Sequence, residues 1–275
     1  MDIEKFYDTD KNLIPFYLSD IVSWHGHIAF AFWIIKRLRP SVFVELGVHK
    51  GDSFFAFCRA NEKYHRKDER YYGIDNFVGD DHSGRYNEEI YHKVLALSNN
   101  FKYSFIYRLT FEEANKKFEN NSISLLHIDG FHTYEAVKHD FETWLPKMKN
   151  DGVILFHDST EKQTGFGVYK FVEELKEKYD KIRTFKHSHG LTVLSLGSNW
   201  INKLFDLTEE EFEEFERYLE DHSKKICEAY QMLNRWNIMQ MRIDFDKDDL
   251  YLSSEMHKLF DKYFSKTFLG KLLYI

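Results

Sequence analysis

The sequence has few of the residues that mark several classes of protein. It contains two cysteines, Cys58 and Cys227, without a short C-x-x-C spacing, which argues against a disulfide framework or a structural zinc site. It has three prolines and no proline-rich linker, low-complexity tract or internal repeat. This low cysteine content fits a reducing compartment, so we expect a cytosolic protein.

Long apolar runs and clustered positive charge are also missing. The longest apolar run, residues 28–35, is far shorter than the roughly 20 residues of a membrane-spanning helix. The N-terminus is acidic where a signal peptide would be basic and then apolar. With 38 basic and 45 acidic residues the formal charge is −7, and no basic stripe is interleaved with aromatics. We expect neither a transmembrane segment nor a nucleic-acid partner.

What the sequence does contain is an alternation of short apolar strands with helical segments. The predicted strands are residues 41–47, 71–75, 123–130 and 152–158. Three of them have an acidic residue at or directly before their last position and most precede a helical pattern, which indicates βαβ units and a largely parallel sheet covered on both faces. A mostly apolar helix from about Ser23 to Arg39 comes before them, and a helix over 168–179 and a strand within 187–197 come after them. We predict a Rossmann-like α/β core.

The composition divides the chain into three predicted parts. These are an N-terminal helical cap over 1–40, the Rossmann-like domain over 41–197 and a C-terminal helical extension over 198–275. Thr208 and Glu211 have the spacing of a capping box, with Leu207 and Phe212 placed as a hydrophobic staple. The apolar stripe of the following helix consists of Phe212, Phe215, Leu219 and Ile226. We expect this stripe to pack on the core or on a second copy in a homo-oligomer, and the apolar, lysine-bearing end of the chain is a candidate contact for a partner or a membrane surface.

The first predicted strand ends in a glycine-containing turn. Glu45, Gly47 and Gly51 have the spacing E-x-G-x-x-x-G, which differs from the dinucleotide fingerprint G-x-G-x-x-G. Gly47 allows a sharp turn and a close ligand approach, while the Glu45 carboxylate suits an ammonium group better than a phosphate. Asp75, at the end of the next strand, is placed to bind a ribose diol.

A nucleoside that carries an amino acid has both of these groups, and S-adenosylmethionine (SAM) is therefore the predicted cofactor. We take Ser53 and Asn76 as further cofactor contacts, together with Asp129. The alternative is that the two glycines only serve a tight turn, with Glu45 as an incidental polar residue.

Polar residues also follow the two later strands. Asp129 and His132 follow one of them, and His157 with Asp158 ends the other. Because the carboxyl ends of parallel strands can be neighbours, we expect Asp129, His157 and Asp158 to converge, and this donor set suits Mg²⁺ or Mn²⁺. Histidine has an ordinary pKa near 6.5, so His132 would have a neutral fraction able to accept a proton. A helix-capping or core role is the alternative for His132, and a turn role is the alternative for Asp158.

These segments resemble bacterial class I SAM-dependent methyltransferases of the family-24 kind, which include macrolide and sugar O-methyltransferases and enzymes of surface-glycan gene clusters. The resemblance is carried by "VELGVHKGDSFFAF", "GIDNFVGDDHSGRY" and above all "SLLHIDGFHTYEAVKHDFETWLPKMKNDGVILFHDS", and it covers about residues 19–197. It implies a seven-stranded, mostly parallel sheet with one antiparallel strand, SAM as methyl donor, a divalent metal at the positions of Asp129, His157 and Asp158, and a general base at His132. His157 stands where such metal enzymes often have a carboxylate.

Several residues near this site are candidates for the acceptor. They are Trp24 and His27 in the first helix, Arg85 and Tyr86 in a long polar loop, and His189 before the late strand. Core packing, loop solvation and a strand-entry turn are their respective alternatives.

We predict an O-methyltransferase acting on a hydroxyl, or on a phosphate or phosphoramidate oxygen, of a carbohydrate or related small metabolite. The alternatives are a nicotinamide-dependent oxidoreductase, which would need the missing fingerprint, and a non-catalytic SAM-binding scaffold of a glycan-assembly complex. A nucleic-acid methyltransferase is disfavoured by the acidity of the chain.

Overall fold

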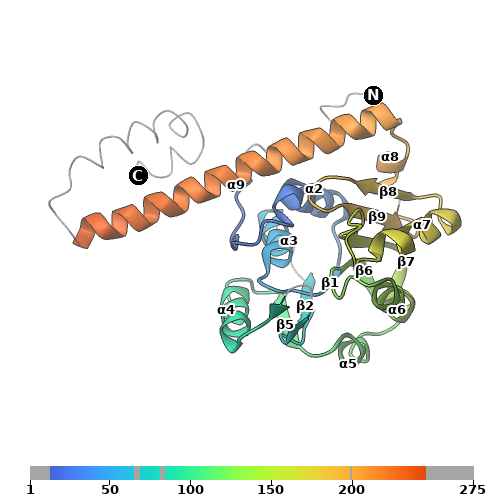
Figure 1. Cartoon of the computed structure of the whole chain (residues 1–275), viewed down its shortest axis with the longest axis horizontal. Helices are drawn as coiled ribbons and strands as arrows, with labels where there is room; N and C mark the ends of the chain where they lie inside the picture. The colour runs from blue at the N-terminus through green and yellow to red at the C-terminus, as the bar shows by residue number, and fades with distance from the viewer. Residues whose placement is uncertain (1–12, 65–68, 81–83, 199, 246–275) are drawn as a thin grey trace.

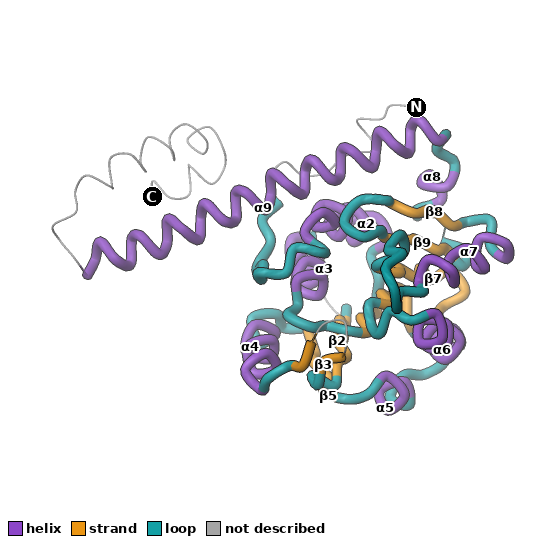
Figure 2. Tube along the Cα trace, in the orientation of Figure 1, coloured by secondary structure: helices purple, strands orange, loops and turns teal. Residues whose placement is uncertain are grey.

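A computed structural model describes residues 13–64, 69–80, 84–198 and 200–245. These residues form a twisted seven-stranded sheet between two layers of helices, with the strand order β5-β2-β1-β6-β7-β9-β8 (Figures 1 and 2). The strands are β1 (Val42–Leu46), β2 (Arg70–Asp75), β5 (Ser104–Arg108), β6 (Ile123–Ile128), β7 (Met148–His157), β8 (Ile182–Phe185) and β9 (Leu191–Ser195). Strand β9 is antiparallel to both neighbours and the other adjacent pairs are parallel. The predicted Rossmann-like fold is confirmed.

Helices and a small hairpin surround this sheet. The helices are α2 (Ile28–Leu38), α3 (Asp52–Lys63), α4 (Glu88–Ser98), α5 (Phe111–Asn115), α6 (Tyr134–Trp144), α7 (Val168–Lys178), α8 (Asn202–Phe205) and α9 (Glu209–Phe245), with 3-10 turns η1 (His25–His27) and η2 (Leu145–Lys147). The hairpin consists of β3 (Gly79–Asp80) and β4 (Gly84–Arg85). The predicted helix over 23–39 therefore begins with a 3-10 turn, and it ends at Arg39, whose backbone is left-handed.

Alternate residues of the strands pack on opposite faces of the sheet, as a period of two requires. Phe43 and Leu125 face the core that contains α2, α3 and α9. Val44 and Leu126 face the second core, beneath α6 and α7. Because both faces are covered, the strands read as continuous apolar runs, which is why these strands could be recognised in the sequence.

The C-terminal helix α9 begins as the sequence predicts. The backbone N–H of Thr208 donates to Glu211 Oε2 at 2.9 Å, and the backbone N–H of Glu211 donates to Thr208 Oγ1 at 3.2 Å, which completes the capping box. The stripe of Phe212, Phe215, Leu219 and Ile226 is buried in the core of this same chain. The rest of α9 projects away from the domain (Figure 1). The division of the chain at residues 40 and 197 stays a prediction, and the apolar end of the chain lies outside the described residues.

No helix in the described part of the chain is long and apolar enough to cross a membrane. Both cysteines are buried and neither forms a disulfide.

Candidate active site

The candidate site lies where the strand order of the sheet reverses. Strand β1 pairs with β2 on one side and with β6 on the other, and ligands of open α/β sheets bind outside the carboxyl ends of the strands at such a point. A cavity of about 370 Å³ opens there. Its walls come from the turns after β1, β2, β5, β6 and β7 and from the segment before η1.

The glycine turn after β1 brings two strand ends together. Gly47 has a φ of +91°, and a Cβ at this position would lie 2.0 Å from the carbonyl oxygen of Asp129. The backbone N–H of Asp129 donates to the Leu46 carbonyl at 2.9 Å. Only glycine allows this approach, which places the turn after β1 directly beside the turn after β6.

Asp75 organises the cofactor side of the cavity. Its carboxylate accepts hydrogen bonds from the backbone N–H groups of Val48 (3.1 Å), His49 (2.9 Å) and Phe77 (2.6 Å). Burial raises the pKa of this carboxyl, and the three amides oppose that effect. Asp75 and the adjacent Asn76 both line the cavity, as expected of cofactor contacts.

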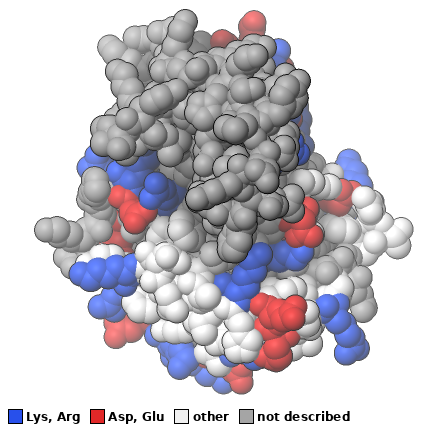
Figure 3. Space-filling model, turned by 90° about the vertical axis from the view of Figure 1, so that its left-hand side faces the viewer, with Lys and Arg blue, Asp and Glu red and all other residues white. Residues whose placement is uncertain are grey.

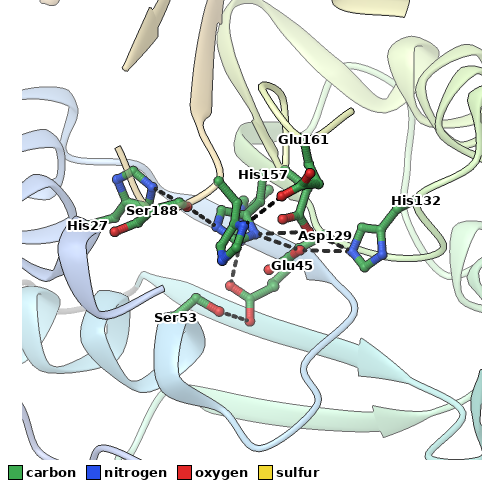
Figure 4. Close-up of polar contacts among 11 residues, drawn as sticks. His27, Glu45, Ser53, Asp129, His132, His157, Glu161 and Ser188 are labelled. Carbon is green, nitrogen blue, oxygen red and sulfur yellow. Dashed lines mark hydrogen bonds and ion pairs between the residues drawn. The ribbon is translucent and has the colours of Figure 1, made fainter. Parts of the chain in front are cut away.

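Glu45 lies behind the cavity wall and does not line it. Its carboxylate is fully buried and accepts a hydrogen bond from Ser53 Oγ at 3.0 Å, while His127 Nδ1 lies 2.8 Å from its other oxygen (Figure 4). Burial raises the pKa of Glu45, although His127 and Ser53 act in the opposite direction. Ser53 does line the cavity, and contact of Glu45 or Ser53 with a cofactor stays a prediction.

The segment before η1 covers the cavity from the N-terminal side. Asp52, in the first turn of α3, accepts hydrogen bonds from the backbone N–H of Ser19 at 2.7 Å and from its hydroxyl at 2.5 Å. His25 Nε2 lies 3.0 Å from the same carboxylate. These contacts hold Trp24, which is 3% exposed, against the cavity.

Four side chains from the ends of β6 and β7 gather at the acceptor side (Figure 4). His132 Nε2 lies 2.9 Å from Asp158 Oδ2 and 3.6 Å from Asp129 Oδ1. His157 Nδ1 lies 3.2 Å from Asp129 Oδ1 and 3.4 Å from Asp158 Oδ2. Asp158 has a left-handed backbone with a φ of 53°, and this turns its carboxylate toward His132. The residues that the sequence predicts to converge therefore lie close together in the structure.

The donor set that can hold a metal differs from the predicted one. Asp129, His132 and Asp158 each offer a ligand atom, and these atoms lie within 4.8 Å of one another. His157 is the predicted third ligand. Its ring is buried and its Nε2 lies 3.2 Å from the Ser188 carbonyl. A carbonyl oxygen only accepts, so Nε2 donates to it, while Nδ1 faces the carboxylates. The group above contains His132 in its place, and the role of His157 as a ligand stays a prediction.

The protonation of His132 also differs from the expectation. Burial alone would lower its pKa, but the hydrogen bonds and charges of Asp129 and Asp158 outweigh burial and raise the pKa to about 9. The expectation that His132 has a ready neutral fraction near neutral pH is therefore wrong for this geometry. Burial would raise the pKa of both carboxyls, but His157 and His132 hold the pKa of Asp129 and of Asp158 well below the usual range. The two acids are thus ionised and neutralised by imidazolium groups.

The segment after β7 covers His132. The rings of His132 and Phe166 stack with their centroids 5.1 Å apart and their planes at 10°. The backbone N–H of Gly167 donates to the His132 carbonyl at 2.8 Å. Phe131, 39% exposed, lies at the mouth of the cavity. Phe131 therefore faces the cavity, whereas Phe166 does not line it and contacts the His132 ring.

The candidate acceptor residues fall into two groups. Trp24 and Tyr86 line the cavity, and the Tyr86 ring stacks on His49 with centroids 4.7 Å apart. The other three lie outside it. His27 is fully buried with Nε2 at 3.3 Å from the Ser188 carbonyl, His189 pairs with Glu161 at 3.0 Å, and Arg85 lines a separate cavity of about 380 Å³. None of these three side chains is placed to contact an acceptor in the main cavity directly.

Some cavity residues were missed in the sequence. Thr110, Phe111 and Glu112 follow β5 and line the cavity. Thr110 and Glu113 form a capping box for α5, and this T-x-x-E spacing after an aromatic, β-branched run was a usable signal for a strand followed by a helix. His49 and Asp52 had no comparable signal, because their roles depend on the turn after β1.

Comparisons with known proteins found similarity over part of the chain. Residues 44–159 match a family model described as "Methyltransferase domain". The match covers fewer than half of the 275 residues. It runs from within β1 to just past β7 and includes every member of the acceptor-side cluster.

A curated relative is the uncharacterised protein y4gI of Sinorhizobium fredii (strain NBRC 101917 / NGR234), which is 40% identical over 184 residues. The match covers 66% of this chain and 20% of the relative, so the chain spans about a fifth of that protein's length.

Two of the solved structures to which this chain is similar are methyltransferases. One is the S-adenosylhomocysteine (SAH)-bound methyltransferase PaMTH1 of Podospora anserina, with 12% identity, a TM-score of 0.47, and coverage of 70% of this chain and 91% of that one. The other is the O-methyltransferase TomG of Streptomyces achromogenes in complex with SAM, with 12% identity, a TM-score of 0.45, and coverage of 72% and 100%.

Proposed function

We propose that the protein is a SAM-dependent O-methyltransferase whose acceptor is a hydroxyl, or a phosphate or phosphoramidate oxygen, of a carbohydrate or related small metabolite. One observation carries the proposal: a single cavity joins the Gly47 and Asp75 turns to the cluster of Asp129, His132 and Asp158. The resemblance of the sequence to sugar and macrolide O-methyltransferases supports the acceptor class, and a cytosolic role in surface-polysaccharide or natural-product biosynthesis follows from it.

The residues of the cofactor side suit the two ends of SAM. Asp75 retains lone pairs toward the cavity, where it would accept hydrogen bonds from the ribose hydroxyls. Asn76 lies beside it and would contribute a further polar contact. Ser53, oriented by Glu45, would face the amino-acid end, next to the bare backbone of Gly47 and Gly51.

The acceptor side suits a divalent metal ion. Two carboxylates and one imidazole form a donor set that Mg²⁺ or Mn²⁺ accepts, with sites left for a substrate oxygen. Such an ion, when bound, would orient an acceptor hydroxyl and increase its acidity. His157 would donate to Asp129 and fix its carboxylate, which is the support that ligands commonly receive from their neighbours.

The transfer itself places three demands on this chain. SAM, held by Asp75, Asn76 and Ser53, would supply the methyl group: the acceptor oxygen would bond to the methyl carbon while the carbon–sulfur bond breaks and its electron pair goes to sulfur, which gives SAH. Where Nε2 of His132 holds no metal, the ring must first lose its own proton, because its pKa is raised to about 9. The neutral ring would then accept the hydroxyl proton at Nε2, and the resulting imidazolium would be stabilised by Asp129 and Asp158. Phe131, which lines the cavity, would help to exclude water from the reacting atoms.

Calorimetric titration of the full-length protein tests the cofactor. We expect SAM and SAH to bind with micromolar dissociation constants and NAD and NADP not to bind. Binding of NAD or NADP in place of SAM would favour an oxidoreductase. Binding of SAM without methyl transfer to any member of a broad sugar and nucleotide-sugar panel would favour the non-catalytic scaffold.

The roles of His132 as ligand and as base exclude one another, because both use Nε2. Mn²⁺ binding, followed by electron paramagnetic resonance with saturating SAH, separates them. His132→Ala should weaken Mn²⁺ binding at least tenfold if His132 is a ligand and leave it unchanged if it is only a base. His139→Ala, on an exposed face of α6, is the matched control. Wild-type protein that binds SAH but no Mn²⁺ would remove the metal from the proposal.

A further inference from the structure

The C-terminal helix α9 contacts the acceptor side through one buried carboxylate. Glu216 is 8% exposed. Its Oε1 accepts hydrogen bonds from the backbone N–H of Lys186 and from the backbone N–H of His187 at 3.1 Å, and His187 Nδ1 also lies 3.1 Å away. All three donors belong to the turn between β8 and β9, so Glu216 ties that turn to α9.

The turn between β8 and β9 has a conformation that needs support from its surroundings. Ser188 and His189 have φ values of 48° and 66°, and Gly190 has a φ of 90°. Each non-glycine residue in this region is unfavourable, so such turns persist only where neighbours fix them. His187 Nε2 lies 3.2 Å from the Gly26 carbonyl, and a Cβ on Gly26 would lie 2.0 Å from Ser188 Oγ. The turn is thus held between α9 and η1.

The Ser188 carbonyl of this turn then meets the site itself. His157 Nε2 lies 3.2 Å and His27 Nε2 lies 3.3 Å from its oxygen (Figure 4). Because Nε2 of His157 donates to this carbonyl, the ring is fixed with Nδ1 toward Asp129 Oδ1, at 3.2 Å.

The same turn also holds the backbone that follows His157. The backbone N–H of Ser159 donates to the Gly190 carbonyl at 3.4 Å, and the backbone N–H of Thr160 donates to the His189 carbonyl at 3.0 Å. The position of Asp158, which lies between His157 and Ser159, is therefore set from both sides by one turn. Displacement of that turn would move His157 and Asp158 together.

We propose that Glu216 is a positioning residue of the acceptor site, acting through the Ser188 carbonyl on the ring of His157 and hence on Asp129. The proposal rests on the proposed function, because it takes Asp129 and Asp158 as the groups that hold the metal and orient the acceptor. It gives the C-terminal extension a role beyond covering the core: α9 supplies the outer support of the site.

Three substitutions separate this role from a contribution to stability alone. Glu216→Leu removes the acceptor oxygen, whereas Glu216→Gln keeps an oxygen that can accept the same three hydrogen bonds. Glu214→Leu adds the same side chain at an exposed position of the same helix and is the control. If Glu216→Leu fails to fold, His187→Leu takes its place in the test, because this substitution removes the side-chain contacts of the turn with both Glu216 and Gly26.

Two ligand measurements on the full-length chain form the test. With Mn²⁺ as the metal probe and SAH as the cofactor probe, Glu216→Leu should weaken Mn²⁺ binding about tenfold or more and change the SAH dissociation constant less than about twofold. Glu216→Gln and Glu214→Leu should bind both like the wild type. Loss of SAH and Mn²⁺ affinity in equal measure would indicate a general structural role and overturn the proposal, as would unchanged Mn²⁺ affinity.

Hydrogen exchange provides a readout that does not need the metal. Glu216→Leu should accelerate exchange of the Ser159 and Thr160 amides, because the turn that accepts their hydrogen bonds loses its anchor. If the wild type binds SAH but no Mn²⁺, the metal part of the proposed function fails and this measurement alone decides the role of Glu216. Unchanged exchange at both amides would then overturn the proposal.

Discussion

At the scale of single residues, Gly47 ties the cofactor side to the acceptor side. Gly47→Ala would place a Cβ 2.0 Å from the backbone of Asp129 at a φ of +91°. Backbone cannot yield as a flexible side chain does, so we expect a loss of about 2 kcal/mol or more in unfolding free energy and a SAH affinity at least tenfold weaker.

Urea denaturation and calorimetry measure the two effects of Gly47→Ala. Gly84→Ala is the matched control, because Gly84 has a φ of +79° but no atom within 4 Å of the position that a methyl group would take. It should cost only the backbone conformation, about 1 kcal/mol, with unchanged SAH binding. Equal effects of the two substitutions would contradict the importance of the contact with Asp129.

Asp140 is a buried acid that the proposed mechanism does not use. Burial raises its pKa to about 7 from 3.8, the charge of the neighbouring His139 opposes this, and Glu112 adds to it. Because the folded-state pKa is the higher one, Asp140 loses its proton at a lower pH in the unfolded chain than in the folded protein. The stability contributed by this group is therefore present below about pH 4 and is lost as the pH rises to about 7.

Asp140→Asn keeps the shape of the protonated acid and removes its titration. We expect the variant and the wild type to be similar below about pH 4, and the variant to be more stable at pH 8 by up to about 4 kcal/mol, the free-energy equivalent of that pKa difference. Urea denaturation at each pH measures this. Parallel pH dependences would show that Asp140 is ionised in the folded protein.

The sequence identified the residues of the acceptor-side cluster but not which of them form the donor set for a metal. Asp129, His132, His157 and Asp158 could all be named because they follow apolar strands. Which histidine completes the donor set depends on the left-handed backbone at Asp158 and on the Ser188 carbonyl. Neither has a local signal, since serine and aspartate rarely adopt that conformation and the partner of His157 lies 31 residues away.

At the scale of elements, the segment over the cofactor side is fastened by Asp52. Asp52→Ala removes the acceptor for both donors of Ser19 and the partner of His25. The segment that carries Trp24 should then become more mobile, and we expect the SAH dissociation constant to rise about tenfold, since ordering that segment would oppose binding.

The control for Asp52→Ala is Asp20→Ala, which breaks the exposed pair of Asp20 with Lys50 in the same segment. Exposed ion pairs contribute about 0–1 kcal/mol, so SAH binding should change less than about threefold. Calorimetry measures both variants. If Asp52→Ala binds SAH as well as the wild type does, then the segment that carries Trp24 is held by apolar packing and not by Asp52.

Elements were recognised in the sequence according to how completely they are covered. Strands β1, β2, β6 and β7 were predicted because helices cover both of their faces. Strand β5, at one edge, has partly exposed side chains, and β8 forms the other edge. Their mixed polarity made them hard to recognise, since an edge strand needs fewer apolar residues.

At the scale of the whole molecule, the face shown in Figure 3 carries basic and acidic side chains side by side, and the formal charge of the chain is −7. The absence of a nucleic-acid partner stays a prediction. Self-association through the C-terminal helices stays a prediction, and it would have to use a surface other than the buried stripe of α9.

The first half of α9 packs as part of the domain, which predicts one cooperative unfolding unit. Phe215 is fully buried, and its ring centroid lies 5.1 Å from Trp33 and 5.9 Å from Phe185. Phe215→Ala should therefore lower the unfolding free energy of the whole protein by about 3–5 kcal/mol. Met232→Ala, farther along α9 where the side chain is 41% exposed, should change it by less than about 0.5 kcal/mol.

Urea unfolding followed by both far-ultraviolet circular dichroism and tryptophan fluorescence checks this. If α9 belongs to the same unit, the two signals should change together and Phe215→Ala should shift both midpoints equally. If the extension is a separate domain, the helical signal would show an earlier transition that alone responds to Phe215→Ala. Because Glu216 follows Phe215 directly on this same packed half of α9, a separate early transition would also remove the support that α9 gives to the acceptor site.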